Sequence, residues 1–266
     1  MLDMFSLLAC FACTQAAPLP VPADTIAVDV ELVLAVDISL SMNEKEFALQ
    51  RAGYVAALRH PDFIKAVRSG TNGRIALAYF EWAGTVRDDA ILAWQIIDGS
   101  DSANAFADRI AARPFRSFRG TSISGALAFG ADLFEKTGFT GARRVIDMSG
   151  DGPNNIGPPV TATRDAALAK GIVINGLPIL ISPSPTFSHL DSYYAQCVTG
   201  GPGSFVLPIY AASEFSTAIR RKLILEVSGI ANATTVRIDA AAPIDCLQGE
   251  RDRRFFSDPY FPELDR

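Results

Sequence analysis

The chain has 266 residues, of which 49% are apolar and 20% are charged, and 24 Lys and Arg against 29 Asp and Glu give a net charge of −5. This composition supplies ample material for a core and excludes a disordered or fibrous chain. The mild acidity argues against nucleic acid as the main partner, because neutralising phosphates requires a face rich in Lys and Arg. With only 2 His in the chain, a zinc site built from histidines is not expected either.

The first 16 residues are typical of a secretory signal peptide rather than of a folded domain. Residues 4–13 are largely apolar, and this run is too short to span a bilayer, which takes about 20 residues. The start carries Asp3 and no basic residue, so a buried first helix is the alternative. The sequence around Cys10 also resembles a lipoprotein cleavage box. We favour plain export, to the periplasm or the outside of a bacterial cell.

After a Pro-rich linker at residues 17–27, strand and helix patterns alternate, and we expect one domain at residues 28–228. In chain order the expected elements are strand 28–38, helix 43–58, strands 74–82 and 90–97, helices 102–112 and 122–136, strand 144–149, helix 159–170, strand 172–180, helix 190–198, strand 204–209 and helix 213–227. The rest, residues 229–266, is expected to be an irregular C-terminal extension, because it contains prolines and few periodic stretches.

This alternation predicts an α/β fold with a doubly wound, mostly parallel six-stranded sheet and helices on both faces. The apolar centre of the first strand, residues 32–36, is typical of a parallel strand that is buried on both sides. The short link at residues 83–89 contains Gly84 and favours a hairpin between the second and third strands. We therefore expect one edge strand to be antiparallel.

Two cysteines, Cys197 and Cys246, lie behind the expected leader. In an exported protein such a pair is most simply one disulfide. It would close a loop of about 50 residues, worth about 4 kcal/mol on the chain-entropy model. We expect it to tie the C-terminal extension back to the domain. The alternative, two free buried thiols in a cytosolic protein, applies only if the leader interpretation is wrong.

Short oxygen-bearing side chains gather where strands of this predicted sheet end. Asp37, Ser39 and Ser41 alternate directly after the first strand, Thr121 precedes the long helix, and Asp151 follows the fourth strand. Ligands of open α/β sheets bind beyond the carboxyl ends of the strands, so these residues are the candidates for a site.

Two carboxylates and three hydroxyls form a hard, all-oxygen donor set without thiolate or imidazole. Such a set favours Mg²⁺, with Mn²⁺ as a second possibility, over zinc or copper. An ion held partly by neutral oxygens accepts a further anionic oxygen from outside. The alternative is that Ser39 and Thr121 are helix N-caps and that the two aspartates are turn residues.

The motif Asp-x-Ser-x-Ser at 37–41, with Gly-Thr at 120–121 and Asp-Gly at 151–152, resembles a von Willebrand factor A domain with a metal-ion-dependent adhesion site. The resemblance implies a Rossmann-like fold and an ion whose sixth position is taken by an Asp or Glu of a partner protein. It also implies a ligand set, consisting of Asp37, Ser39, Ser41, Thr121 and Asp151.

The resemblance covers residues 28–227, which is most of the chain behind the expected leader. Ser-Gly-Asp-Gly at 149–152 replaces the commoner Thr-Asp-Gly of the family and leaves the aspartate in place. Together with a late Gly-Gly-Pro-Gly at 200–203, the pattern is similar to a bacterial exported branch of such domains with no assigned function.

Three arginines lead into the loop that carries Thr121 and suggest a positive rim around the site. Arg113, Arg116 and Arg119 alternate with two phenylalanines, and such a rim would steer an acidic partner towards the metal. The alternative is a solvated loop that the two phenylalanines anchor to the core. We place Arg116, Arg119 and Asn154 on this rim, and we expect Asn154 to shape its loop through hydrogen bonds to backbone.

Asp147 lies inside the fourth predicted strand, where a carboxylate is costly to bury without a partner. We expect it to point towards a sheet end or to pair with Arg143 or Arg144. A role as a catalytic acid is less favoured.

These features favour an exported, metal-dependent protein-binding module without catalytic activity, acting in adhesion or as a scaffold. One alternative is a metal-dependent hydrolase that uses Asp37, and another is a purely structural envelope protein. The first loop lacks the Asp-x-Asp arrangement of aspartyl-phosphate enzymes, and neither a Ser-His-Asp set nor a nucleotide-binding loop is visible.

Overall fold

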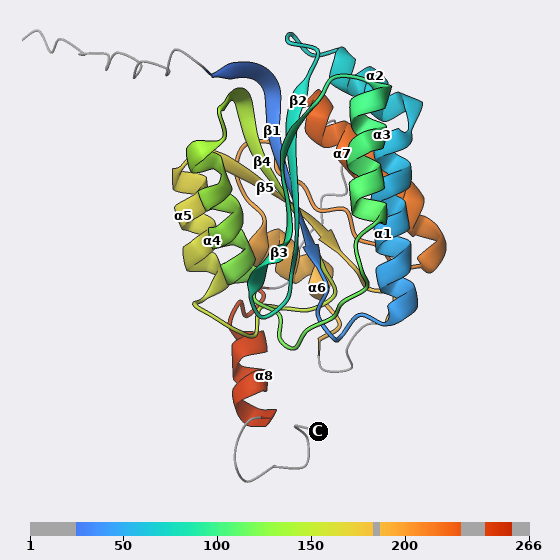
Figure 1. The fold of residues 1–266 in the computed structure, drawn as a ribbon. Helices are drawn as coiled ribbons and strands as arrows, with labels where there is room; N and C mark the ends of the chain where they lie inside the picture. The colour runs from blue at the N-terminus through green and yellow to red at the C-terminus, as the bar shows by residue number, and fades with distance from the viewer. Residues whose placement is uncertain (1–24, 183–186, 230–242, 257–266) are drawn as a thin grey trace, which may run out of the picture.

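A five-stranded sheet runs through the middle of the computed structural model, which describes residues 25–182, 187–229 and 243–256 (Figure 1). The strand order is β3-β2-β1-β4-β5, with β1 parallel to both β2 and β4, β4 parallel to β5, and β3 antiparallel to β2. This confirms a mostly parallel sheet with one antiparallel edge strand. The strands are β1 Ile26–Asp37, β2 Ile75–Trp82, β3 Val86–Ile97, β4 Phe139–Gly150 and β5 Ile172–Pro178.

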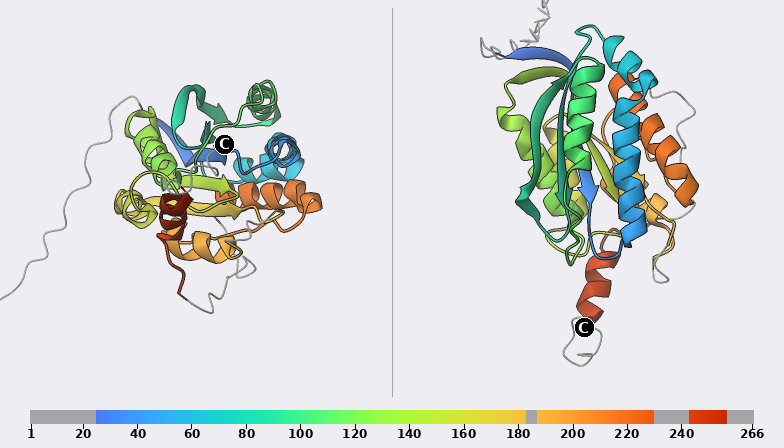
Figure 2. Two further views of the ribbon diagram at one scale, coloured as in Figure 1. Left: turned by 90° about the horizontal axis from the view of Figure 1, so that it is seen from below. Right: turned by 45° about the vertical axis from the view of Figure 1, so that its right-hand side comes forward.

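Helices cover both faces of this sheet, as Figures 1 and 2 show. One face packs against α1, α2, α3 and α7, and the other packs against α4, α5 and α6. Their bounds are α1 Glu44–Arg59, α2 Pro61–Arg68, α3 Ser100–Ala111, α4 Ile123–Leu133, α5 Val160–Ala169, α6 Leu190–Tyr193 and α7 Phe215–Ser228, and a last helix, α8 Gln248–Phe256, belongs to the C-terminal extension. A π-helical turn, Tyr194–Val198, continues α6.

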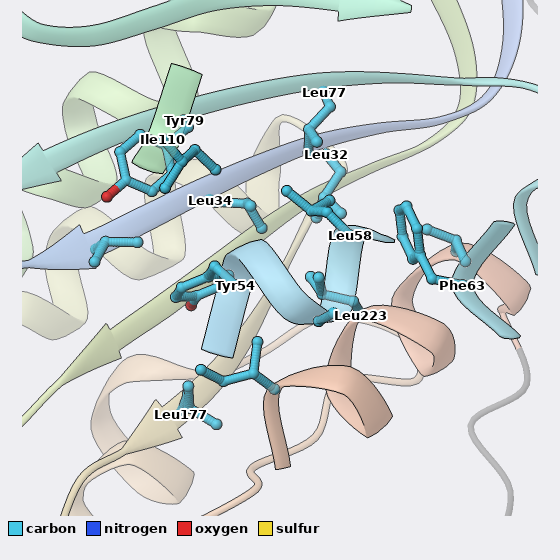
Figure 3. Close-up of a cluster of buried hydrophobic side chains, with 14 of the residues drawn as sticks. Leu32, Leu34, Tyr54, Leu58, Phe63, Leu77, Tyr79, Ile110, Leu177 and Leu223 are labelled. Atoms are coloured by element: carbon cyan, nitrogen blue, oxygen red, sulfur yellow. The ribbon is translucent and has the colours of Figure 1, made fainter. Parts of the chain in front are cut away.

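The core explains why β1 reads as an almost unbroken apolar run. Its alternate residues point to opposite faces, so Leu32 and Leu34 join the cluster under α1 while Val33 joins the cluster under α4. Figure 3 shows the first cluster, where Tyr54 and Leu58 of α1 pack onto the strand. Burial on both sides fixes the position of β1, whose carboxyl end carries the candidate site.

The expected sixth strand, residues 204–209, does not form a strand among the described residues. The segment runs beside β5 and makes two isolated bridges, Gly176 to Val206 and Ile179 to Ile209. Backbone hydrogen bonds join the two segments, among them Leu207 N to Gly176 O and Ile209 N to Pro178 O, both at 2.9 Å. Pro178 lacks an N–H group, so the bond that its nitrogen would donate is missing and the ladder is interrupted there. The expectation of six strands was wrong, and the segment instead covers the edge of β5.

Two helices and one boundary also differ from the sequence expectations. The α2 helix was not expected, although Pro61 lies at its first position and the His60 ring accepts a hydrogen bond from Asp62 N at 3.1 Å. The extension, expected to be irregular, contains α8. The expected leader lies outside the described residues, as does the linker up to residue 24, and β1 starts inside the expected linker at Ile26.

The predicted disulfide is confirmed. Cys197 in the π-helical turn and Cys246 just before α8 are bonded, with their Cα atoms 5.6 Å apart. The bond therefore ties the extension to the body of the domain. Within the described ranges, none of the helices has the length and apolar character needed to cross a bilayer.

Candidate metal site

The carboxyl ends of β1 and β4 lie side by side, and the loops that follow them form the candidate site. In the parallel register of the two strands, Val36 is opposite Ser149, so Asp37 and Gly150 end the pair together. A third loop joins them, because Ser39 forms a bridge with Phe118 and Leu40 N donates to Phe118 O at 3.0 Å. Three loops that are distant in sequence therefore meet at one edge of the sheet.

Short hydrogen bonds connect the loop that follows β1 to Asp151, in the loop that follows β4. The hydroxyl oxygens of Ser39 and Ser41 lie 2.9 Å apart, and Ser41 Oγ donates to Asp151 Oδ1 at 2.6 Å. Ser39 N donates to Asp37 Oδ1 at 2.7 Å. The structure thus brings together four of the five predicted ligands, although Asp151 follows Ser41 by 110 residues.

Thr121, the fifth predicted ligand, faces the loop that follows β4. Its backbone N donates to Asn155 Oδ1 at 2.8 Å, and its carbonyl accepts from Asn155 N at 2.8 Å. A Cβ atom placed on Gly152 would lie 3.8 Å from Thr121 Oγ1. The threonine side chain is therefore next to the residue that follows Asp151.

The N-terminal caps of the neighbouring helices are formed by other residues. Asn43 caps α1 and accepts from Lys45 N and Glu46 N, while Ser122 caps α4 and accepts from Gly125 N. Capping therefore does not account for the positions of Ser39 and Thr121.

Burial dominates the electrostatics of the two aspartates. It raises the pKa of Asp37 well above the ordinary value, and the nearby charge of Asp151 raises it further. Burial also raises the pKa of Asp151 to about 6, although the hydrogen bond from Ser41 opposes the shift. A cation placed between the two carboxylates would favour their ionised forms and offset this cost.

The donor set fits a hard divalent cation. Asp37 Oδ2 is buried and has no hydrogen-bond partner among the described residues, which is the state expected of an oxygen that is meant to receive a ligand. The remaining groups are hydroxyl and carboxylate oxygens, which suit Mg²⁺ better than zinc. In the part of the chain that the structure describes, no three His, Cys, Asp or Glu side chains gather to hold a metal, so such an ion depends on the hydroxyls.

Glu46, a third carboxylate close to the site, was not expected from the sequence. The side chain is buried, accepts from Asn43 N at 3.1 Å and from Ser182 Oγ at 2.8 Å, and its charge contributes to the raised pKa of Asp151. The spacing Asn-x-x-Glu at 43–46 is that of a capping box and could have revealed the position of this carboxylate.

The residues expected on the rim divide into exposed and buried ones. Arg116 is exposed and pairs with Asp89, and Arg119 is also exposed. Arg113 points inward instead, where its guanidinium lies 2.9 Å from Glu81 Oε2.

Asn154 is fully buried and does not lie on the rim. Its side-chain oxygen accepts from Ser124 N at 2.9 Å, and its amide nitrogen donates to Glu250 Oε1 at 2.8 Å and to Pro158 O at 3.2 Å. These bonds connect the Asp151 loop to the start of α4 and to α8.

The C-terminal helix α8 packs against the site loops, and Figure 1 shows it beyond the carboxyl ends of β1 and β4. A Cβ atom on Gly249 would lie 2.2 Å from Asn154 O, and one on Gly120 would lie 3.2 Å from a guanidinium nitrogen of Arg253. The helix therefore contacts both the loop that carries Asp151 and the loop that carries Thr121.

Solved structures with a similar fold are von Willebrand factor A domains. Proximal thread matrix protein 1 (PTMP1) from the mussel byssus matches with a TM-score of 0.56 and 14% identity, over 77% of this chain and 50% of that chain. The vWF domain of the type V pili tip protein Mfa5 from Porphyromonas gingivalis matches with a TM-score of 0.54 and 10% identity, over 77% of this chain and 97% of that chain. The pilus adhesin SpaC from Lactobacillus rhamnosus GG matches with a TM-score of 0.53 and 12% identity, over 76% of this chain and 31% of that chain.

Another PTMP1 structure, with a TM-score of 0.55 and 15% identity, has a zinc occupied MIDAS motif and matches over 77% of this chain and 49% of that chain. The present chain thus spans about half the length of the mussel protein. At these identities the likeness shows the fold, which is that of a von Willebrand factor A domain, as the sequence resemblance predicted.

No curated protein matches the chain. The family model described as "Protein of unknown function (DUF1194)" matches residues 27–231, and the chain therefore belongs to this family.

Proposed function

We propose that this protein is a protein-binding module that depends on a divalent metal ion, Mg²⁺ in the first place. An Asp or Glu of a partner protein completes the coordination of the ion, and the surrounding loops supply specificity. The ligands in this proposal are Asp37, Ser39, Ser41, Thr121 and Asp151. The module acts in adhesion or as a scaffold and performs no reaction of its own.

The observation that carries this proposal is the hydrogen-bonded chain Ser39–Ser41–Asp151 beside the unpartnered Asp37 Oδ2. Oxygen atoms from separate loops converge there, as an octahedral ion requires. Three of the five donors are neutral hydroxyls, so an ion bound to them retains affinity for another anionic oxygen. A carboxylate of a partner is such a group.

The confirmed disulfide supports the proposal that the protein is exported, because disulfides persist in oxidising compartments. We place the protein in the periplasm or outside the cell, with residues 1–16 as leader, 17–27 as linker, 28–228 as the binding domain and 229–266 as the extension. The exposed Arg116 and Arg119 remain candidates for steering an acidic partner.

Titration calorimetry with Mg²⁺ and Mn²⁺ tests the metal site directly. We expect binding by the wild type and none by Asp37→Ala. Asp101→Ala is the matched control, because Asp101 is an exposed aspartate in the first turn of α3, at the opposite edge of the sheet. Equal binding by Asp37→Ala and the control would contradict the proposal.

The partner is tested by crosslinking in an envelope extract, with and without chelator. We expect a crosslinked protein that disappears in chelator and with Asp37→Ala but persists with Asp101→Ala. A partner captured equally under all these conditions would show that metal does not mediate the contact. Turnover of phosphate or carboxyl esters that is lost with Asp37→Ala would favour the hydrolase instead.

A further inference from the structure

Two buried polar atoms face the same point beside the candidate site. The Tyr194 hydroxyl and Asp37 Oδ2 are both inaccessible to solvent, and neither has a hydrogen-bond partner within the described ranges. A Cβ atom placed on Gly150 would lie 2.7 Å from the tyrosine oxygen and 2.8 Å from Asp37 Oδ2. The two atoms are therefore neighbours across the last residue of β4.

Glycines in two adjacent strands make room for this tyrosine. A Cβ atom on Gly176 of β5 would lie 2.8 Å from Tyr194 Cδ1, and any side chain at Gly150 would collide with the hydroxyl. Gly150 is also where this chain departs from the commoner Thr-Asp-Gly pattern, since its sequence there is Ser-Gly-Asp-Gly. The glycine at position 150, where the commoner pattern has threonine, thus leaves room for Tyr194 to approach Asp37.

The segment that carries Tyr194 is held on several sides. The Tyr193 hydroxyl accepts from Asn154 N at 3.1 Å, Thr199 N donates to Tyr194 O at 2.8 Å, and Cys197 forms the disulfide with Cys246. The turn itself is π-helical, a conformation that is often found at functional sites. The tyrosine ring is therefore held in place and is not free to turn towards solvent.

We propose that Tyr194 is a positioning residue of the candidate metal site, whose hydroxyl donates a hydrogen bond to Asp37 Oδ2 through one bridging water molecule. This inference rests on the proposed function. A tyrosine hydroxyl is protonated at neutral pH and can donate, whereas an ionised carboxylate can only accept, so the pair is complementary. The bond orients the carboxylate and stabilises its charge, as outer groups do for the ligands of other metal sites.

The first test compares Mg²⁺ affinity between the wild type and Tyr194→Phe, which removes only the hydroxyl. We expect the dissociation constant to rise about tenfold, the lower end of the effect of losing such an outer partner. Tyr54→Phe is the matched control, because Tyr54 is equally buried but its hydroxyl faces Asp147 on the other side of the sheet. The control is expected to bind Mg²⁺ as the wild type does.

The second test needs no metal. In chelator, melting temperatures are compared among the wild type, Tyr194→Phe, Asp37→Ala and the double variant. The shift caused by Tyr194→Phe is expected to shrink by about half or more once Asp37 is alanine, because the acceptor is then gone. A purely structural role of the tyrosine would give the same shift in both backgrounds.

The outcomes separate this inference from the proposed function. If the wild type binds Mg²⁺ but Tyr194→Phe binds it equally well, or the melting shifts are additive, the role of Tyr194 is overturned and the metal site stands. If the wild type binds no Mg²⁺, the proposed function fails and the positioning role fails with it. Gly150→Ala is a second variant, which would push the two atoms apart and should weaken Mg²⁺ binding even if Tyr194→Phe did not fold.

Discussion

The Lys222 ammonium lies 2.7 Å from Asp147 Oδ1 in a part of the core where both side chains are fully buried. Lys222 also pairs with Glu226 one helical turn later, and Asn175 Nδ2 donates to the same glutamate at 3.1 Å. One cation thus compensates two buried carboxylates and fastens α7 to β4. Asp147 was expected to point towards a sheet end or to pair with Arg143 or Arg144, and the pair with Lys222 shows that this expectation was wrong.

Replacing Lys222 with Met should destabilise the fold strongly, because it leaves two buried carboxylates without a cation. We expect the free energy of unfolding to fall by about 3–5 kcal/mol, measured by urea denaturation. The exposed pair of Lys170 with Glu135 provides the control, and Lys170→Met should cost far less, because solvent screens an exposed pair. Equal losses in the two variants would contradict the interpretation of the buried network.

The same network should make stability depend on pH. Burial raises the pKa of Glu226 from its ordinary value of 4.5 to about 7, and the charge of Asp147 adds to the shift. Between these two values the folded chain holds a proton that the unfolded chain releases. The free energy of unfolding should therefore fall as the pH rises from about 4.5 to 7, by at most about 3 kcal/mol.

Urea denaturation at several pH values checks this dependence. The buried Asp37, Asp147 and Asp151 also have raised pKa values, so the Glu226 contribution is the difference between the wild type and Glu226→Gln. The variant should show a flatter pH profile in this window. Parallel profiles would mean that Glu226 has a similar pKa in the folded and the unfolded chain.

Binding of Mg²⁺ should stabilise the folded protein, because the loops that we propose as its site come together only on folding. At a concentration of 100 times the dissociation constant, the expected gain is about 2.7 kcal/mol, or about 5–10 °C in melting temperature for a domain of this size. Thermal unfolding with Mg²⁺ or chelator measures the gain. It should vanish with Asp151→Asn and persist with Asp101→Asn, and a gain that survives both substitutions would place the ion elsewhere.

Removing the disulfide should loosen the C-terminal helix. We expect Cys197→Ser with Cys246→Ser to lower the free energy of unfolding by about 2–4 kcal/mol. Because α8 packs on the Asp151 loop, hydrogen exchange at residues 151–158 should also accelerate. A reducing agent should reproduce both effects in the wild type and change nothing in the variant. Unaltered exchange in the loop would show that α8 does not support it.

Asn154 is buried within the same loop and forms hydrogen bonds to its surroundings, so Asn154→Ala should lower the stability of the fold. The variant loses bonds to Ser124 N, Pro158 O and Glu250 Oε1, which we expect to lower the free energy of unfolding by about 2–4 kcal/mol. Asn104→Ala is the control, because Asn104 is exposed on α3 and alanine favours a helix there. Equal stability of the two variants, measured by urea denaturation, would contradict the structural role of Asn154.

The sequence predicted those parts of the fold that depend on local patterns. The apolar run of β1 and the hairpin between β2 and β3 were identified because burial and turn chemistry leave traces in consecutive residues. The short α2 was missed, since eight residues give little periodicity. The sixth strand was predicted wrongly, because the pattern of residues 204–209 is that of a strand while Pro178 of β5 interrupts its pairing.

The candidate site was predictable only as far as its motif extends. The Asp-x-Ser-x-Ser spacing and the strand ends pointed to residues that the structure indeed brings together. Residues that contact the site or the core from distant elements could not be recognised from the sequence around them. Tyr194 reads as an ordinary core aromatic, and Lys222, 75 positions after Asp147 in the printed sequence, reads as a surface residue of a helix. Such pairings arise only when the chain packs.

The covalent link between Cys197 and Cys246 keeps α8 next to the loop that carries Asp151. Under the proposed function, a partner that binds at Asp37 and Asp151 would also contact α8, so this helix would limit the surface that the partner can cover. A shortened version that stops at residue 228 would present a more open entrance. Ligands selected against that version should differ from those of the intact polypeptide.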